Sequence, residues 1–284
     1  MLGIDVGAET IKIAELALDR DGTTRWTRRM IREHHKAPMA QLAAMLEEFD
    51  WDGVDAAAVT GRLSRTVNLP RIPVKQAQIR GFETIVGDGP ATVVSIGSHG
   101  FSVLEIRDSG VEMFRENSRC SQGTGNFLRQ LVERFDMTIE DASAITRNVA
   151  KPAPLSGRCP VILKTDMTHL ANKGEPREQI LAGLFDAVCE NVQVLIKPRV
   201  SPRNVYLIGG VTRAPRIHDT FDRFLARNHM QRVATRDDDN LFFEAVGCAA
   251  IAARHPSAPP TMNHLFDAPE EHTLEGLPPL SDYL

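Results

Sequence analysis

The strongest constraint on the fold of this 284-residue chain is an internal repeat at an offset of 90 residues. Segment 4–16 aligns without a gap with segment 94–106, and apolar positions coincide, as do Gly7 with Gly97 and one glutamate in each copy. Each copy predicts a strand, a glycine-containing turn and a second strand, and a third strand candidate follows it. We therefore expect two similar lobes, each built on a β-hairpin.

The other elements follow from hydrophobic periodicity and turn residues. A helix at 139–146 is expected to begin with Thr138 as N-cap and Asp141 at its fourth position. Third strands are predicted near 24–30 and 110–115, further strands at 54–60 and 204–208, and further helices at 38–49, 74–86, 125–135, 161–172, 177–196 and 241–253. We expect an N-terminal lobe over 1–89, joined by a helix at 241–254, a C-terminal lobe over 90–240, and a Pro-rich acidic tail over 255–284 that is solvated or docks a partner.

Composition narrows the function classes. A formal charge of −4 leaves no broad basic surface, so nucleic acid is not an expected partner. Met1 leads directly into an apolar strand, and no run approaches the roughly 18 apolar residues of a membrane span, which predicts a cytoplasmic protein without a membrane partner. In that reducing compartment Cys120, Cys159, Cys189 and Cys248 are not expected to form disulfides. We expect Cys189 and Cys248 to be buried in helices.

The first glycine turn carries groups that suit phosphate binding. Asp5 ends an apolar strand, and a carboxylate there can hold a hydrated Mg²⁺ against phosphates. The same turn supplies backbone amides, a hydroxyl and an ammonium through Gly7, Ala8, Glu9, Thr10 and Lys12. An ordinary hairpin with a polar tip is the alternative.

Three more glycine turns follow in order. The second copy of the repeat has Gly97 and Ser98, and a Gly-x-Gly turn at Gly123, Thr124 and Gly125 opens a helix, where amides can close on a phosphate. Gly209, Gly210 and Val211 follow a strand and offer bare backbone to a flat ring. Each alone is compatible with a plain strand-to-helix turn, but together they favour a nucleotide cleft between the lobes.

A cysteine lies directly before the Gly-x-Gly turn. The thiolate of Cys120 is a soft ligand suited to iron or zinc, although a single cysteine is more often a small buried apolar residue. Zinc-type spacing of cysteine and histidine is absent, so a structural zinc site is not expected.

These residues resemble a known family. The order of Asp5-x-Gly7, Ile96-Gly97 and Gly209-Gly210 resembles the actin-like ATPase superfamily, and Cys120-x-x-Gly123-Thr124-Gly125 with Cys159 resembles the BadF/BadG/BcrA/BcrD ATPases. The resemblance covers about residues 2–253. It implies an α/β, two-lobed actin-like (ribonuclease H-like) fold with duplicated βββαβαβα lobes.

The resemblance also implies a function. Two subunits, a second copy or a paralogue, would share one [4Fe–4S] cluster through Cys120 and Cys159 of each chain. ATP with Mg²⁺ would drive low-potential electron transfer from a donor such as ferredoxin or flavodoxin to a 2-hydroxyacyl-CoA dehydratase or benzoyl-CoA reductase-type partner.

The chain departs from that pattern at two places. The second turn reads Gly97-Ser98-His99-Gly100 where the activators have Gly-Gly-Gln-Asp, which leaves hydrolysis open. His99 either polarises a water or is simply solvated. After Cys159, where the activators typically have Ala-Glu-Ser or Ala-Glu-Thr, Lys164, Asp166 and His169 are expected to form a polar helix face. The alternative is that Lys164 adds positive charge near the cluster and raises its potential. A weakly hydrolysing or non-hydrolysing partner subunit and a small-molecule kinase therefore remain as alternatives, although no acidic residue lies in the Gly97 turn to deprotonate an acceptor.

Overall fold

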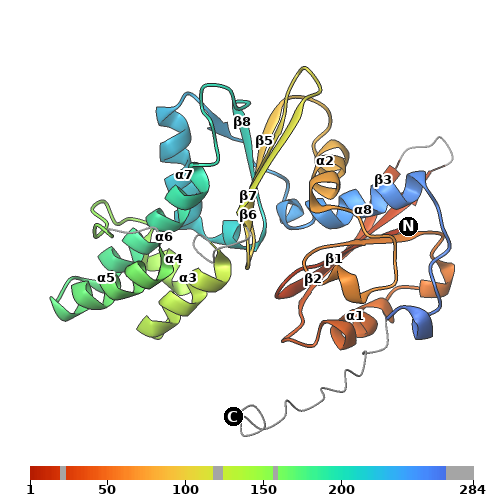
Figure 1. The fold of residues 1–284 in the computed structure, drawn as a ribbon, viewed down its shortest axis with the longest axis horizontal. Coiled ribbons are helices and arrows are strands. Elements are labelled where there is room, and N and C mark those ends of the chain that lie inside the picture. The colour runs from red at the N-terminus through yellow and green to blue at the C-terminus, as the bar shows by residue number, and fades with distance from the viewer. Residues whose placement is uncertain (20–23, 118–123, 156–158, 267–284) are drawn as a thin grey trace, which may run out of the picture.

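The computed structural model describes residues 1–19, 24–117, 124–155 and 159–266, and within them the chain forms two β-sheets linked through helices (Figure 1). The first sheet has the order β3-β2-β1-β4, and the second has β7-β6-β5-β8-β9. The strands are β1 (Leu2–Val6), β2 (Thr10–Leu18), β3 (Thr24–Glu33), β4 (Ala57–Thr60), β5 (Ala91–Ile96), β6 (Phe101–Ile106), β7 (Glu112–Asn117), β8 (Asn204–Ile208) and β9 (Gln231–Arg232).

The register of the strands confirms the internal repeat. In the antiparallel pair β1 and β2, Ile4 lies opposite Ile13, and in the pair β5 and β6, Val94 lies opposite Val103. Both pairs are thus related by the same offset of 90. Each copy also adds a parallel neighbour to its first strand, β4 in one sheet and β8 in the other. The second sheet continues to β9, whereas in the described part of the first sheet only an isolated bridge from Val59 to Arg71 extends past β4.

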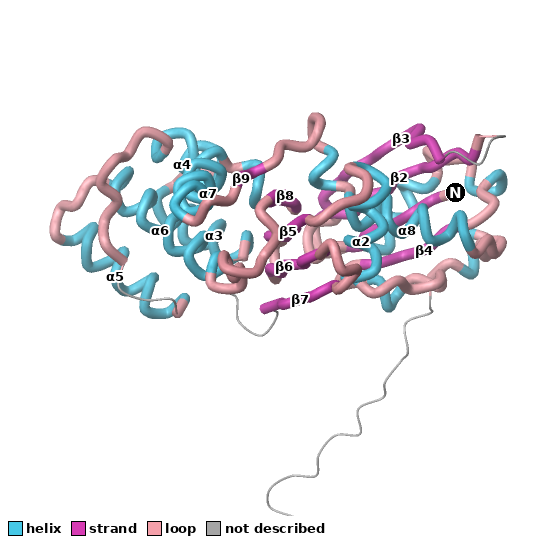
Figure 2. The backbone as a smooth tube through the Cα atoms, turned by 90° about the horizontal axis from the view of Figure 1, so that it is seen from above, coloured by secondary structure: helices cyan, strands magenta, loops and turns pink. Residues whose placement is uncertain are grey.

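Helices cover the sheets in layers. They are α1 (Pro38–Leu46), α2 (Val74–Ile85), α3 (Gly125–Val132), α4 (Ile139–Thr146), α5 (Pro160–Asn172), α6 (Arg177–Gln193), α7 (Pro215–Arg227) and α8 (Phe243–Arg254). Figure 2 shows α3, α4, α6 and α7 beyond one side of the second sheet, with α2 and α8 on its other side. No helix among the described residues has both the length and the apolar character needed to cross a bilayer.

Alternating side chains explain why both faces of the second sheet are covered. Val94 and Ile96 of β5 belong to the core formed with α3 to α7, whereas Ala91 and Val93 pack with α2 and α8. Successive residues of a strand point to opposite faces, so one apolar strand supplies two cores. In α4, Thr138 is the N-cap and accepts a hydrogen bond from the Asp141 amide at 3.1 Å, which confirms the predicted helix start.

Helix α8 lies between the first sheet and α2 at very short range. A Cβ at Gly3 of β1 would lie 1.9 Å from the carbonyl oxygen of Ala245, and one at Gly247 would lie 1.8 Å from that of Ala77. Gly81 of α2 is equally close to Phe243. Glycine lets these backbones approach each other.

The first part of the expected tail packs on the N-terminal core. The Trp51 indole donates to the carbonyl of Pro260 at 2.9 Å, and the Asn68 amide donates to that of Leu265 at 2.7 Å. Leu265 is fully buried in the core of the first sheet. Up to Phe266 the chain therefore follows this lobe instead of extending as a free arm, and the remaining expected tail lies outside the described residues.

Candidate functional site

The turn between β1 and β2 is closed by its own backbone. The Gly7 amide donates to the carbonyl of Thr10 at 3.0 Å, and a Cβ at Gly7 would lie 2.8 Å from that oxygen. Ala8 and Glu9 form the tip of the turn. The predicted first phosphate turn is therefore a tight hairpin turn that begins where β1 ends.

Asp5 and Lys12 form a nearly buried ion pair beside this turn. They lie opposite each other in the sheet, and the Lys12 Nζ contacts Asp5 Oδ2 at 2.8 Å. Burial alone would lower the Lys12 pKa, but the Asp5 carboxylate, with a smaller effect from Glu244, raises the pKa above its ordinary value. Lys12 therefore already neutralises the charge of the Asp5 carboxylate. One carboxylate at a strand end suits a Mg²⁺ ion held through water.

The second turn repeats the geometry of the first. The Gly97 amide donates to the carbonyl of Gly100 at 2.9 Å, 90 residues after the matching bond. The Nδ1 atom of His99 is buried and has no hydrogen-bond partner among the described residues. The His99 residue as a whole is half-buried. A cavity of about 160 Å³ adjoins the turn, with Gly97, Gly100, Gln78 and Ser95 among its lining residues.

Helix α3 is attached directly to the second turn. Thr124 caps the helix and accepts from the Phe127 amide, while the amides of Gly125 and Asn126 donate to the carbonyls of Gly97 and Ser98, both at 2.9 Å. The Gly125 amide, expected to bind phosphate, instead supports the turn that contains Gly97. The other two predicted residues of this segment, Cys120 and Gly123, lie outside the described residues.

The third turn follows β8 and adjoins the second. Gly209 has a φ of 94°, and a Cβ there would lie 2.6 Å from the carbonyl oxygen of Ile96. Val211 contacts Gly125, since a Cβ on that glycine would lie 2.7 Å from the Val211 side chain. A Cβ at Gly210 would meet no described heavy atom within 4 Å. The structure thus brings the second turn, the start of α3 and the third turn together.

Among the polar contacts that join the two lobes in the described residues, two lie beside the glycine turns, and the sequence did not predict either. Arg129 of α3 binds Glu9 at the tip of the first turn. On α8, Glu244 Oε1 accepts from Gln78 of α2 at 3.0 Å and from Ser95 of β5 at 3.5 Å. Burial, followed by the charge of Asp5, raises the Glu244 pKa. The only sequence signal for Glu244 is that it is the sole charged residue in segment 241–253.

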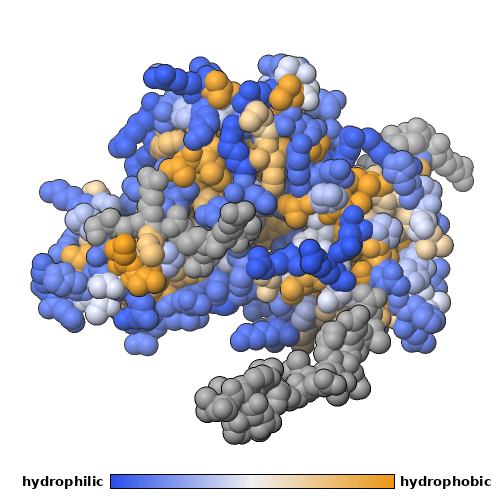
Figure 3. All heavy atoms as spheres, in the orientation of Figure 1, coloured by the Kyte–Doolittle hydropathy of each residue, from blue (hydrophilic) through white to orange (hydrophobic). Residues whose placement is uncertain are grey.

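The three cysteines that the structure describes divide into exposed and buried positions. Cys159 is exposed at the N-cap of α5, whereas Cys189 and Cys248 are fully buried, as predicted. Burial is the first cause that raises the pKa of both buried thiols well above its ordinary value. Next to Cys159, Val161 and Ile162 are 71% and 48% exposed. Figure 3 shows apolar side chains among polar ones over the helical end of the second lobe.

Beyond Cys159, α5 presents charged groups to solvent. Lys164 and His169 are exposed and Asp166 is half-buried, which agrees with the predicted polar helix face. Leu163 and Met167 are buried on the opposite side of the helix.

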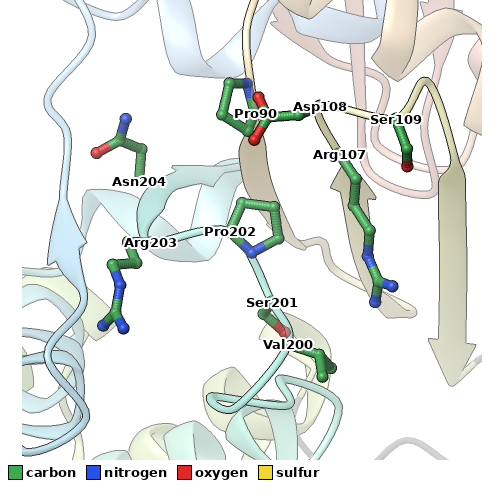
Figure 4. Close-up of a pocket in the computed structure, with 9 residues that line it drawn as sticks. All are labelled: Pro90, Arg107, Asp108, Ser109, Val200, Ser201, Pro202, Arg203 and Asn204. Atoms are coloured by element: carbon green, nitrogen blue, oxygen red, sulfur yellow. The ribbon is translucent and has the colours of Figure 1, made fainter.

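A larger cavity of about 570 Å³ lies away from these turns, at the opposite end of the second sheet. In Figure 4, Arg107 and Arg203 lie on opposite sides of Pro202, so their guanidinium groups do not converge on one point. Arg107 is instead paired with the buried Glu105. The lining residues are Pro90, Arg107, Asp108, Ser109, Val200, Ser201, Pro202, Arg203 and Asn204.

Solved structures share this architecture. The activator of the 2-hydroxyisocaproyl-CoA dehydratase from Clostridium difficile with bound ADPNP matches with a TM-score of 0.75 and 21% identity, over 90% of this chain and 94% of that chain. The (R)-2-hydroxyglutaryl-CoA dehydratase component A from Acidaminococcus fermentans matches with a TM-score of 0.77 and 20% identity, over 90% and 98%. These matches confirm the predicted actin-like fold class.

Comparisons of the sequence find relatives of the same kind as these solved structures. A 2-hydroxyisocaproyl-CoA dehydratase activator from Clostridioides difficile is 24% identical over 75% of this chain and 81% of its own length. A benzoyl-CoA reductase subunit from Thauera aromatica is 24% identical over 89% and 93%. The model of the BadF/BadG/BcrA/BcrD ATPase family matches residues 77–252, more than half of the chain. The chain therefore belongs to the BadF/BadG/BcrA/BcrD ATPase family.

Proposed function

We propose that this chain hydrolyses ATP and uses it to drive low-potential electron transfer from a [4Fe–4S] cluster that it shares with a second subunit. The observation that carries the proposal is the attachment of α3 to the second phosphate turn, through the amides of Gly125 and Asn126. A displacement of that turn would be transmitted to α3, and Cys120 precedes this helix in the sequence. Nucleotide state and cluster environment are then mechanically linked.

The nucleotide would lie between the matched turns. Gly7, Ala8, Glu9 and Thr10 line the first turn, and Gly97 and Ser98 the second, while Gly209 to Val211 offer backbone to the adenosine. Asp5, balanced by Lys12, would hold Mg²⁺ through water. The ion supplies charge neutralisation on the phosphates. The Nδ1 atom of His99, which has no hydrogen-bond partner in the part of the chain that the structure describes, would orient a water, because a buried polar atom gains from a partner.

The cluster would take Cys120 and Cys159 from each of two chains. Cys159 suits this role because its side chain is exposed, and Val161 and Ile162 beside it form an apolar surface that a second subunit can cover. Thiolates are the usual ligands of iron–sulfur clusters. Such a dimer pairs this chain with a second copy or a paralogue.

The names of the relatives indicate the partner class. They are called a dehydratase activator and a reductase subunit. We therefore propose a 2-hydroxyacyl-CoA dehydratase or a benzoyl-CoA reductase-type enzyme as acceptor, and a ferredoxin or flavodoxin as donor. The lobes would be 1–89 and 90–240, with the helix at 241–254 joining the first, and their relative motion would link the nucleotide to the cluster.

A second candidate is a nucleotide-binding subunit that does not hydrolyse ATP. The turn from Gly97 to Gly100 favours it, since no carboxylate lies in that turn. ATPase assays on the isolated chain separate the two functions. Measurable turnover supports the first, and nucleotide binding without turnover supports the second.

The first test is iron and acid-labile sulfide per chain after anaerobic purification. We expect about two irons per chain, because two chains share four. Cys159→Ser should lose the cluster, while the matched control Cys248→Ala should keep it, since Cys248 is buried among alanines of α8 and its neighbours. A folded, ATP-binding dimer that takes up no iron on reconstitution would contradict the cluster proposal.

A further inference from the structure

One ion pair joins the first phosphate turn to helix α3. The two guanidinium nitrogens Nη1 and Nη2 of Arg129 donate to the two carboxylate oxygens of Glu9, with Nη2 at 2.7 Å from Oε1. Nη2 also donates to Asn126 Oδ1 at 3.0 Å, which orients the guanidinium. Two parallel bonds of this kind combine charge with a defined geometry.

Both ends of this pair are anchored in backbone. The His34 amide donates to the carbonyl of Glu9 at 3.0 Å and fixes the tip of the first turn. At the other end, α3 begins on the carbonyls of Gly97 and Ser98. The pair therefore connects the first phosphate turn to the helix that is seated on the second.

We propose that Glu9 and Arg129 form a latch that holds the two phosphate turns together over a bound nucleotide and slows its release. This inference rests on the proposed nucleotide function. The side chains of Arg129 and Glu9 are 43% and 27% exposed, so water and salt compete for them. The latch is thus weak enough to open each time a nucleotide is released. Arg129 acts as a positioning residue, through Glu9 and the two turns.

The test is the rate at which a fluorescent ADP analogue with Mg²⁺ leaves the full-length chain, measured by stopped flow after displacement with excess ADP. Glu9→Gln and Arg129→Gln should each accelerate release by roughly two- to fivefold, the range for a partly exposed pair. The double variant should be no faster than either single variant, because each removes the same interaction. Arg129→Lys should be intermediate, since a lysine keeps the charge and loses the paired geometry.

Two controls make the result specific. Arg134→Gln removes an exposed arginine just beyond α3 whose described hydrogen bond is to Thr168, and it should release the analogue at the wild-type rate. Rising salt should accelerate release more strongly from the wild type than from the double variant, because salt also screens the latch in the wild type. Thermal unfolding midpoints should match across the set, which separates a latch from a fold defect.

The outcomes are distinguishable. Wild-type release rates in both single variants, or effects that add in the double variant, would overturn the latch and leave the proposed function standing. Additive effects would mean that Glu9 contacts the nucleotide without Arg129. A wild-type chain that binds no nucleotide at all would overturn the proposed function, and the latch with it.

Discussion

Gly247→Ala tests the packing of α8 between the first sheet and α2. In an isolated helix this change should stabilise the helix, since the helix propensity of glycine is about 1 kcal/mol less favourable than that of alanine. In this protein the new Cβ would lie 1.8 Å from the carbonyl oxygen of Ala77 and 2.8 Å from the amide nitrogen of Gly81. Both obstacles are backbone atoms, so no side chain can rotate away.

The size of the destabilisation depends on how far α2 and α8 must separate. An ordinary contact begins near 3.4 Å, so α2 and α8 must separate by more than an ångström. Helix α8 cannot retreat, because Gly3 of β1 is equally close to it on the other side. Overpacking of this kind costs about 3 kcal/mol or more, from which the propensity gain of about 1 kcal/mol is subtracted. We expect a net loss of about 2 to 4 kcal/mol, or a midpoint lower by roughly 3 to 7 °C.

Thermal and urea unfolding of the purified chain measure this loss. Gly210→Ala is the matched control, since its Cβ would meet no described heavy atom within 4 Å, and its midpoint should stay at the wild-type value. A Gly247→Ala midpoint equal to or above that of the wild type would show that the helices can separate at little cost, and would refute the reasoning.

Further predictions concern other parts of the molecule. Gly210→Ala should weaken ATP binding by roughly tenfold, measured by calorimetry, since a methyl group would occupy space proposed for the adenosine; unchanged affinity would place the ring elsewhere. Glu105 is fully buried, and although burial alone would raise its pKa, bonds from two arginines and a serine hold the pKa below its ordinary 4.5. The stability that the ionised Glu105 side chain contributes to the folded state is therefore fully present above about pH 4.5, and it is lost as pH falls through the folded-state pKa. Glu105→Gln should cost about 3 kcal/mol at pH 7 and flatten the acid side of the stability curve; a curve parallel to that of the wild type would argue against this account. Iodoacetamide should label Cys159 in the native apoprotein and spare Cys189 and Cys248 until unfolding, as mass spectrometry of peptides would show; early labelling of either buried thiol would mean that its helix opens locally.

Local patterns predicted much of the fold. The repeat could be read because strand alternation and a glycine turn are encoded within a dozen residues, and each hairpin forms from neighbouring residues. The start of α4 at Thr138 and the burial of Cys189 followed from equally local signals. Some boundaries shifted by a few residues: α1 ends at Leu46, before the expected 49, and the strand expected at 54–60 is shorter.

The tertiary structure decided which groups meet. Glu9 and Arg129 are 120 positions apart, and Glu244 lies 149 positions from Ser95, so their contacts depend on how the lobes and α8 pack. The Gly125 amide was expected to bind phosphate, and only the docking of α3 showed that it donates to the carbonyl of Gly97.

The sequence by itself determined two hairpin lobes, their glycine turns and the buried cysteines, because these depend on side-chain periodicity and on the conformational freedom of glycine. Only the tertiary structure decided that α8 is clamped between β1 and α2, that residues up to Phe266 return to the first lobe, and that one ion pair links the first turn to α3. The physical reason is that such contacts join segments far apart in the chain, and their geometry exists only after the two sheets and the helices between them have packed.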